Sequence, residues 1–292
     1  MRVIERFCRG KRDDQSLNED GLIVTDDFAA VVDGVTSKSV RHVWQPSGGV
    51  VAKNILLNAI AGLSADASMR QVQAKLDACL RIQYGTGADA SLFEHEPWER
   101  LQANAVVYGT YRHEAWLFGD CQIMVNGVQM PTVKRVDELL GELRSFAAQA
   151  LTLQKESCVS MDSDEDVRPS DSANGPDIRT RQVNDPARDM ILPFLRLQSQ
   201  FANKTGMYGY FVFDGFTDPT YPIRTVPVHP GDEVVLASDG YPLLRPTLAE
   251  SERELDRLRH DDPQLIRDYR TTKGFVPGQE SFDDRTYMRF IA

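Results

Sequence analysis

The stretch PGDEVVLASDG, residues Pro230–Gly240, indicates most clearly what kind of fold this chain adopts. A Pro-Gly turn opens it, and the apolar run that follows, Glu233–Ala237, is typical of a buried strand. The strand ends at a Ser-Asp-Gly turn, which puts Asp239 at its carboxyl end. A carboxylate at the end of a buried strand is therefore the pattern to look for elsewhere in the chain.

The same pattern recurs at three other places in the sequence. Asp33 ends the apolar run FAAVVDG, Asp120 ends AWLFGD, and Asp283 precedes the closing strand. One such aspartate is usually only a turn residue that bonds nearby backbone amides. Four of them, together with Asn18-Glu19-Asp20 before the first hairpin, predict a site with oxygen ligands only, which suits Mg²⁺ or Mn²⁺.

The remaining elements are predicted from apolar spacing and turn residues. Strands are expected at 22–24, 28–32, 105–108, 115–118, 123–125, 208–213, 233–237 and 286–291, and helices at 51–63, 69–80, 136–153, 188–201 and after the cap at Thr247. Strands cluster in two blocks with helices beside them, which indicates a layered α+β sandwich. We expect one domain, 1–292, with a helical insertion over 128–205 that contains a mobile acidic loop at 161–177.

Composition narrows the partners and the location. The 292 residues carry 43 Asp and Glu against 33 Lys and Arg, a net charge of -10. Such a surface repels nucleic acid and anionic lipid, so neither is an expected partner. No apolar run approaches the ~20 residues of a membrane helix, and the charged N-terminal stretch does not look like a signal peptide. We therefore expect a cytoplasmic protein.

The order of these acidic motifs resembles that of the PP2C (PPM) family of metal-dependent serine/threonine phosphatases, in a divergent bacterial-type form. The matching segments are NED at 18–20, VVDG at 31–34, FGDC at 118–121, PGD to SDG at 230–240, and DDRT at 283–286. The resemblance implies an αββα four-layer sandwich, in which two antiparallel β-sheets face each other and helices flank them. The variable flap of the family falls where this chain has its insertion.

The resemblance also implies roles for the acids. Asp33 would bridge two Mg²⁺ or Mn²⁺ ions. Asp239 and Asp283 would complete the coordination of one ion, and the Gly34 carbonyl would coordinate the other. Glu19 and Asp20 would hold metal-bound waters and act with Asp33 and Asp239 in catalysis. Asp120 matches an acid that holds a third, weaker ion in some members.

The chain departs from the family pattern where the substrate phosphate is held. The family usually has an Arg five residues before the acid that matches Asp20, and this chain has Gln15 there. Arg12, or Lys11, is the alternative source of a phosphate contact. After Asp33-Gly34 the chain reads Val35-Thr36-Ser37 instead of the usual glycine-rich sequence. The metal-binding acids are therefore expected to be kept, and the phosphate contacts to be changed.

The leading hypothesis is a Mg²⁺- or Mn²⁺-dependent phosphatase for phosphoserine and phosphothreonine in proteins. Two alternatives stay open at this stage. One is a weakly active or inactive relative that binds a phosphorylated ligand and regulates a partner, which the loss of the Arg at position 15 favours. The other is a phosphohydrolase for small phosphoesters.

Overall fold

The structure is a computed structural model that describes residues 1–39, 41–85, 88–132, 134–161 and 185–292. Its strands are β1 (Arg2–Arg9), β2 (Asp20–Val24), β3 (Phe28–Gly34), β4 (Ala103–Gly109), β5 (Glu114–Phe118), β6 (Gln122–Val125), β7 (Val128–Met130), β8 (Arg224–Pro227), β9 (Glu233–Ala237) and β10 (Arg285–Ile291). Its α-helices are α1 (Gly48–Ala61), α2 (Met69–Arg81), α3 (Ala88–His95), α4 (Arg135–Met161), α5 (Pro186–Leu197) and α6 (Leu248–Asp261).

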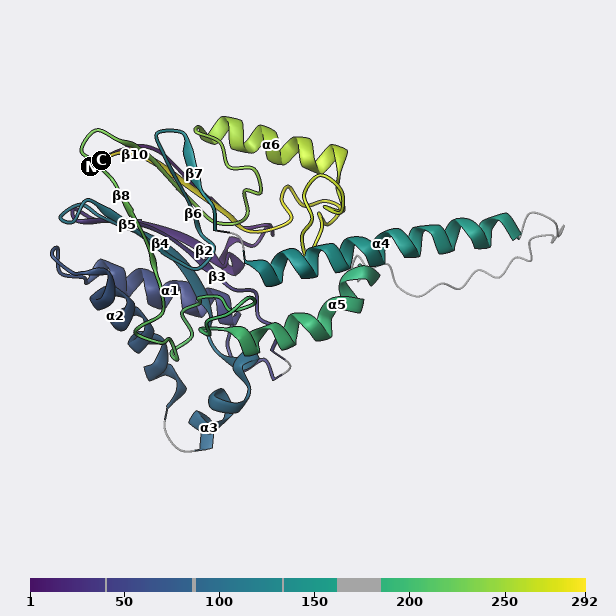
Figure 1. Cartoon of the computed structure of the whole chain (residues 1–292), viewed down its shortest axis with the longest axis horizontal. Helices are drawn as coiled ribbons and strands as arrows, with labels where there is room; N and C mark the ends of the chain where they lie inside the picture. The colour runs from purple at the N-terminus through teal and green to yellow at the C-terminus, as the bar shows by residue number, and fades with distance from the viewer. Residues whose placement is uncertain (40, 86–87, 133, 162–184) are drawn as a thin grey trace.

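The strands form two antiparallel five-stranded sheets that lie face to face (Figure 1). One sheet has the order β1-β10-β9-β6-β7 and the other the order β2-β3-β4-β5-β8. Helices α1 and α2 cover the outer face of the second sheet, and α6 lies on the outer side of the first (Figure 1). The expected αββα sandwich is therefore confirmed.

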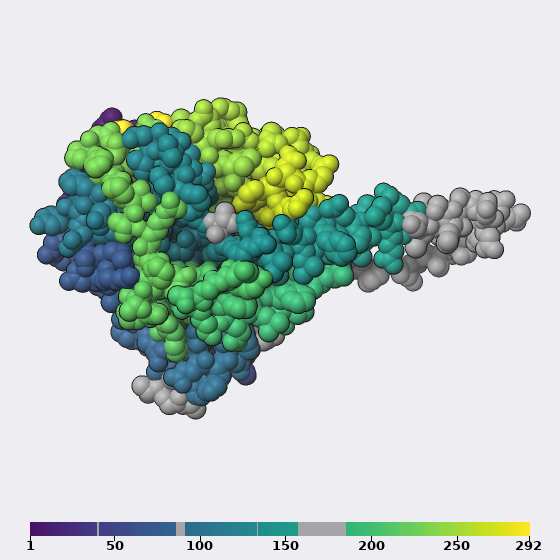
Figure 2. Space-filling view, viewed as in Figure 1, coloured from purple at the N-terminus to yellow at the C-terminus, as the bar shows by residue number. Residues whose placement is uncertain are grey.

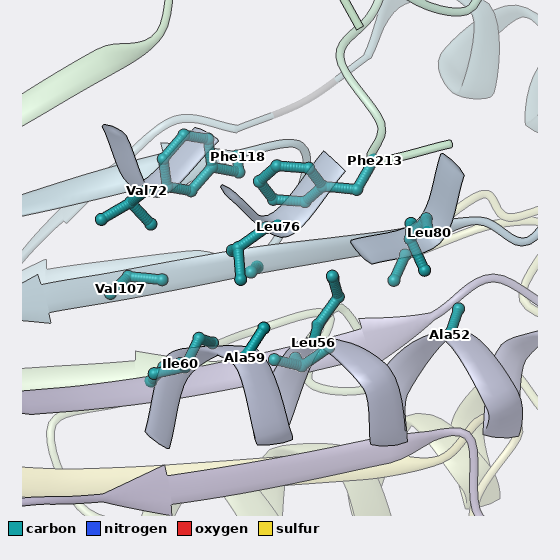
Figure 3. Packing of buried hydrophobic residues seen from close by; sticks show 14 of the residues in the cluster. Ala52, Leu56, Ala59, Ile60, Val72, Leu76, Leu80, Val107, Phe118 and Phe213 are labelled. Atoms are coloured by element: carbon teal, nitrogen blue, oxygen red, sulfur yellow. The ribbon is translucent and has the colours of Figure 1, made fainter. Parts of the chain in front are cut away.

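Alternation along the strands builds two cores, because successive side chains of a strand point to opposite faces. In β3, Ala29 and Val31 pack between the two sheets, whereas Phe28, Ala30 and Val32 pack toward the helices. The helix-side core joins Leu56 and Ile60 of α1 to residues of α2, β4 and β5, as Figure 3 shows. By the same alternation, Asp33 belongs to the face between the sheets, at the end of its strand.

The insertion is a pair of helices that projects from the sandwich (Figure 2). Arg144 of α4 is buried and ties the pair to the body: its guanidinium bonds the Asp185 carboxylate at 2.6 Å and the Gln264 carbonyl at 2.7 Å. The short strand β7 pairs with β6, so Val128–Met130 belongs to a sheet. Apart from Met161, the predicted acidic loop 161–177 lies outside the described residues. The domain limits themselves stay predictions.

Several segments differ from the expectation. Helix α3 and strands β7 and β8 were not predicted. Arg2–Arg9 forms edge strand β1, which was not predicted because its charges interrupt the apolar alternation. The predicted strand at 208–213 is wrong: this segment makes only isolated bridges, at Tyr210 and Phe213. A turn bond at Gly209 and bonds from the Asn203 side chain to Val212 satisfy the backbone there in place of a strand ladder.

Within the described part of the chain, no helix is both long enough and apolar enough to cross a bilayer.

Candidate functional site

Two aspartates face each other across neighbouring strands at one end of the sandwich. Asp20 begins β2 and is paired in register with Asp33 of β3, which in turn is paired with Asn104 of β4. Residues directly opposite each other share a face of the sheet, and like charges placed in this way destabilise the pair. The Asp20 side chain is buried, and one of its carboxylate oxygens has no hydrogen-bond partner among the described residues. A cation bound between the two carboxylates would offset their repulsion.

Glu19 and Gly34 lie beside this pair, at a place where the backbone of Gly34 comes close to that of Gly49. A Cβ at Gly34 would lie 2.2 Å from the Gly49 carbonyl oxygen, so only glycine fits. The Glu19 carboxylate accepts hydrogen bonds from the hydroxyls of Thr36, at 2.6 Å, and Ser47, at 2.7 Å. Gly49, expected only to begin a helix, therefore also makes room for the Glu19 carboxylate.

Asp239 and Asp120 join the pair from the other strand ends. Asp239 follows β9 and Asp120 follows β5, and both line, with Asp33, Gly34 and Asp283, a cleft of about 760 Å³. Gly119 allows this turn: its φ is +101°, and a Cβ there would lie 2.1 Å from the Asn104 side chain. The five aspartates among the six acids predicted to bind or surround metal thus come together at one end of the sandwich, together with Glu19: Asp20, Asp33, Asp120, Asp239 and Asp283.

The acids at this end raise one another's pKa values. Burial raises the pKa of Asp33 well above its usual range, and the charges of Asp239 and Asp20 add to the effect. Burial also raises the pKa of Asp20, with repulsion from Asp284 and Asp283. Although Asp239 is exposed through the cleft, desolvation and the charge of Asp283 raise its pKa to about 7. Three carboxyls are thus held where a negative charge is costly, and a bound cation would relieve that cost.

Asp283 has a different environment from the other acids. Its carboxylate accepts a hydrogen bond from the Lys11 ammonium at 2.9 Å and forms a second ion pair with Lys273. Lys11 also lies 3.8 Å from both Glu19 and Asp284. Although burial opposes it, these two lysines lower the pKa of Asp283. The carboxylate that was expected to complete the coordination of a metal ion is therefore neutralised by two lysine side chains of the protein itself.

Asp120 is neutralised in the same way. Its carboxylate forms an ion pair with the Lys134 ammonium at 2.5 Å, and both side chains are largely buried. Although burial opposes it, Asp120 raises the pKa of Lys134. The site therefore contains two kinds of acid. Asp120 and Asp283 form ion pairs with lysines. Asp20, Asp33 and Asp239 form no ion pair with any described residue.

These residues fit a divalent cation in part. The unpaired oxygen of Asp20, the opposed Asp33 and the open Asp239 provide the oxygen donors that Mg²⁺ and Mn²⁺ prefer. Among the described residues, however, no three or more His, Cys, Asp and Glu side chains are already arranged to hold an ion. Asp33 and Asp239, with the Gly34 carbonyl, remain the candidate ligands, and the two-ion centre stays a prediction.

The segment before Asn18 contains Gln15 and the two candidate phosphate contacts, Lys11 and Arg12. The Gln15 amide bonds the backbone of Gly10 and Arg12, so it holds the loop instead of reaching the cleft. Arg12 is exposed and does not line the cleft, and its predicted phosphate contact stays a prediction. Within this segment, Lys11 is the basic residue that enters the acid cluster. Sequence reasoning could name Lys11 as a candidate, but no motif marks Lys134 or Lys273 as a partner of these acids.

The metal-free protein is expected to lose stability as the pH rises from about 5 to 8. Asp20, Asp33 and Asp239 have raised pKa values, so the folded state holds their protons more tightly than the unfolded chain, whose aspartates titrate near 4. Stability is then present at low pH and is lost through the folded pKa values, about 7 for Asp239. Asp283, with its lowered pKa, changes stability only below about pH 4.

Melting temperatures at pH 5.5 and pH 8 in EDTA measure this dependence. Asp239→Asn should raise the melting temperature at pH 8 and reduce the difference between the two pH values. A wild-type protein that is equally stable at both, or more stable at pH 8, would contradict the raised pKa values.

No family model matches the chain, and no curated protein matches its sequence. Solved structures similar to it over nearly its whole length are serine/threonine phosphatases.

PstP/Ppp of Mycobacterium tuberculosis is 18% identical, with 98% of this chain and 97% of that one covered and a TM-score of 0.43. The PPM phosphatase MsPP of Mycobacterium smegmatis is 14% identical, covers 99% and 98%, and has a TM-score of 0.41. PppA of Pseudomonas aeruginosa, a regulatory component of T6SS, is 12% identical, covers 98% and 95%, and has a TM-score of 0.44. Similarity at this level does not assign an activity.

Proposed function

We propose that the chain is a metal-dependent phosphatase that hydrolyses phosphoserine and phosphothreonine in proteins. The observation that carries the proposal is the placement of Asp20 directly opposite Asp33, with Asp239 beside them in an open cleft. Repulsion among these acids destabilises the folded protein when no cation is bound. Destabilising clusters of this kind are typical of catalytic sites. The order of acidic motifs along the sequence supports the same function.

The residues divide the work as follows. Asp33, Asp239 and the Gly34 carbonyl would hold Mg²⁺ or Mn²⁺, which would lower the pKa of a water and polarise the phosphoryl group. Asp20 has a free carboxylate oxygen that can accept a proton or a hydrogen bond at the same place. Thr36 and Ser47 fix the Glu19 carboxylate, so that it cannot turn away from the cluster.

The test is turnover of p-nitrophenyl phosphate and of phosphoserine and phosphothreonine peptides with added Mn²⁺. We expect activity that EDTA abolishes and Mn²⁺ restores, with a higher kcat/KM on the peptides. Bound Mn²⁺ without turnover on either substrate would overturn the proposal. Activity confined to the small ester would show a phosphohydrolase of another substrate class.

One observation favours a second candidate, a non-catalytic protein that binds a phosphorylated ligand. Lys11 and Lys273 both neutralise Asp283, the carboxylate that the metal-dependent mechanism would require free. Loss of the Arg at position 15 agrees with this reading. The second candidate predicts phosphopeptide binding by the EDTA-treated protein, and no turnover at any Mn²⁺ concentration.

A further inference from the structure

Lys38 is a lysine of the cleft that the proposed chemistry does not use. It lies in the loop after β3 and lines both the large cleft and a small neighbouring cavity of about 40 Å³. The two hollows share Lys38 and Lys134 in their walls, and polar side chains such as Gln102 and Ser199 line the smaller one. The Lys38 side chain is therefore placed where a ligand in the cleft can reach it.

The ammonium group of Lys38 has no hydrogen bond or ion pair to any described residue. The other lysines of the cleft contrast with it: Lys134 is paired with Asp120, and Lys273 with Asp283. A buried or half-buried charge without a partner is costly, and native proteins normally pair such a charge. Lys38 is therefore a cation of the site that is free to bind an anion.

The charges around Lys38 are mainly positive. Burial lowers its pKa to about 8, and repulsion from Lys273 and Arg188 adds to the effect. Arg188 of α5 also lines the cleft, and its guanidinium bonds only a backbone carbonyl, that of Thr272, among the described residues. Asp137 is the opposite charge that Lys38 feels most strongly, but it already accepts a hydrogen bond from Gln198 at 3.1 Å and lies 3.7 Å from Lys134. Among the charges that act most strongly on Lys38, the cations Lys273, Arg188 and Lys134 outnumber the single anion Asp137, which favours a doubly charged ligand such as a phosphate group.

We propose that Lys38, with Arg188, binds the phosphate group of the ligand and takes the place of the Arg that is missing at position 15. Binding of a phosphate anion follows from these two cations alone; that the phosphate belongs to a substrate rests on the proposed function. Two positive donors would give charge-assisted hydrogen bonds to the phosphate oxygens. The negative charges of Asp120 and Asp283 would not prevent this, because each is already neutralised by a lysine.

The experiment measures binding of inorganic phosphate by calorimetry, in EDTA and again with saturating Mg²⁺. Lys38→Met should weaken phosphate binding at least tenfold under both conditions, and Lys38→Arg, which keeps the charge, should retain most of it. Lys204→Met is the matched control, because Lys204 is exposed and lies outside both cavities; it should bind phosphate as the wild type does.

The melting temperature provides a second measurement, which distinguishes a phosphate-binding lysine from a purely structural one. Without phosphate, Lys38→Met should melt no lower than the wild type, since the variant loses an unpaired charge. Added phosphate should raise the melting temperature of the wild type but not of Lys38→Met. A lower melting temperature of Lys38→Met in phosphate-free buffer would show a structural role and overturn the proposal.

The outcomes separate this inference from the proposed function. Phosphate binding that is equal in Lys38→Met and the wild type, or absent from the wild type under both conditions, would overturn the inference. Phosphate binding that depends on Lys38, in a protein without turnover, would support the inference and exclude the phosphatase activity.

Discussion

Asp239→Asn is expected to weaken Mn²⁺ binding by at least about 100-fold, since even residues that only support a metal ligand are worth 10–100-fold. The substitution keeps the size of the side chain but removes a charge that lines the same cleft as Asp33 and repels it. Phosphatase activity should fall at least as far as metal affinity. Calorimetry with Mn²⁺ and initial rates on p-nitrophenyl phosphate measure the two effects.

Asp268→Asn is the matched control for this change. Asp268 also lines the cleft, but its carboxylate bonds the exposed Arg257 guanidinium at 3.1 Å. Loss of its charge alters the overall field of the cleft without removing a candidate ligand, so Mn²⁺ binding should change less than about threefold. Equal Mn²⁺ affinity in Asp239→Asn and the wild type would end the case for a metal at Asp33 and Asp239.

Lys11→Met is expected to be the most destabilising single change at the site in the absence of metal. Its ammonium lies among Asp283, Glu19 and Asp284, and its side chain is only 12% exposed. Removing one partner of a buried ion pair costs about 3–5 kcal/mol. Lys11 is one of the two lysines that neutralise Asp283, and its ammonium keeps a cation away from that carboxylate, so the variant should bind one further equivalent of Mn²⁺ and regain stability at high Mn²⁺.

Lys53→Met gives the comparison for Lys11→Met. Lys53 donates to the backbone carbonyl of Asn18 at 2.8 Å, and in the part of the chain that the structure describes it has no acid partner, so it is a suitable lysine of the same region. Its replacement should cost only about 0.5–1.5 kcal/mol, the usual net value of a hydrogen bond, and should not change the number of bound ions. Chemical denaturation with and without Mn²⁺ measures both variants. Failure of Mn²⁺ to restore Lys11→Met would show that Lys11 has a structural role only.

The gathering of the acids at one end of the sandwich follows in large part from local geometry. A turn after a buried strand places an aspartate such as Asp33 or Asp239 at the strand end, and strands that pack in two sheets bring these ends together. The pairing of Asp20 with Asp33 needed the register of β2 and β3, which the hairpin between them sets.

The lysines could not be predicted in the same way. Lys273 reaches Asp283 from a loop that α4 holds through Arg144 and Ser145, and Lys134 reaches Asp120 from the position just before α4. No motif in the sequence links either lysine to these acids. Segment 208–213 shows a related limit: it has the composition of a strand, but a side chain, that of Asn203, takes the backbone bonds that a ladder would need. Side-chain contacts of this kind, which no motif predicts, decide which acids are available to a metal.

The attachment of the helical insertion determines how the chain can be shortened. Arg144 of α4 bonds the carbonyls of Gln264 and Thr271, and Ser145 bonds that of Ile266, so α4 fixes the loop that leads to Lys273. A Cβ at Gly141 would lie 2.7 Å from the Arg270 carbonyl, which shows how closely helix and loop fit. A truncated protein without α4 and α5 would therefore lose the support of the loop that carries Lys273 to Asp283, together with Arg188. The sandwich without its two projecting helices is a smaller protein with a different site.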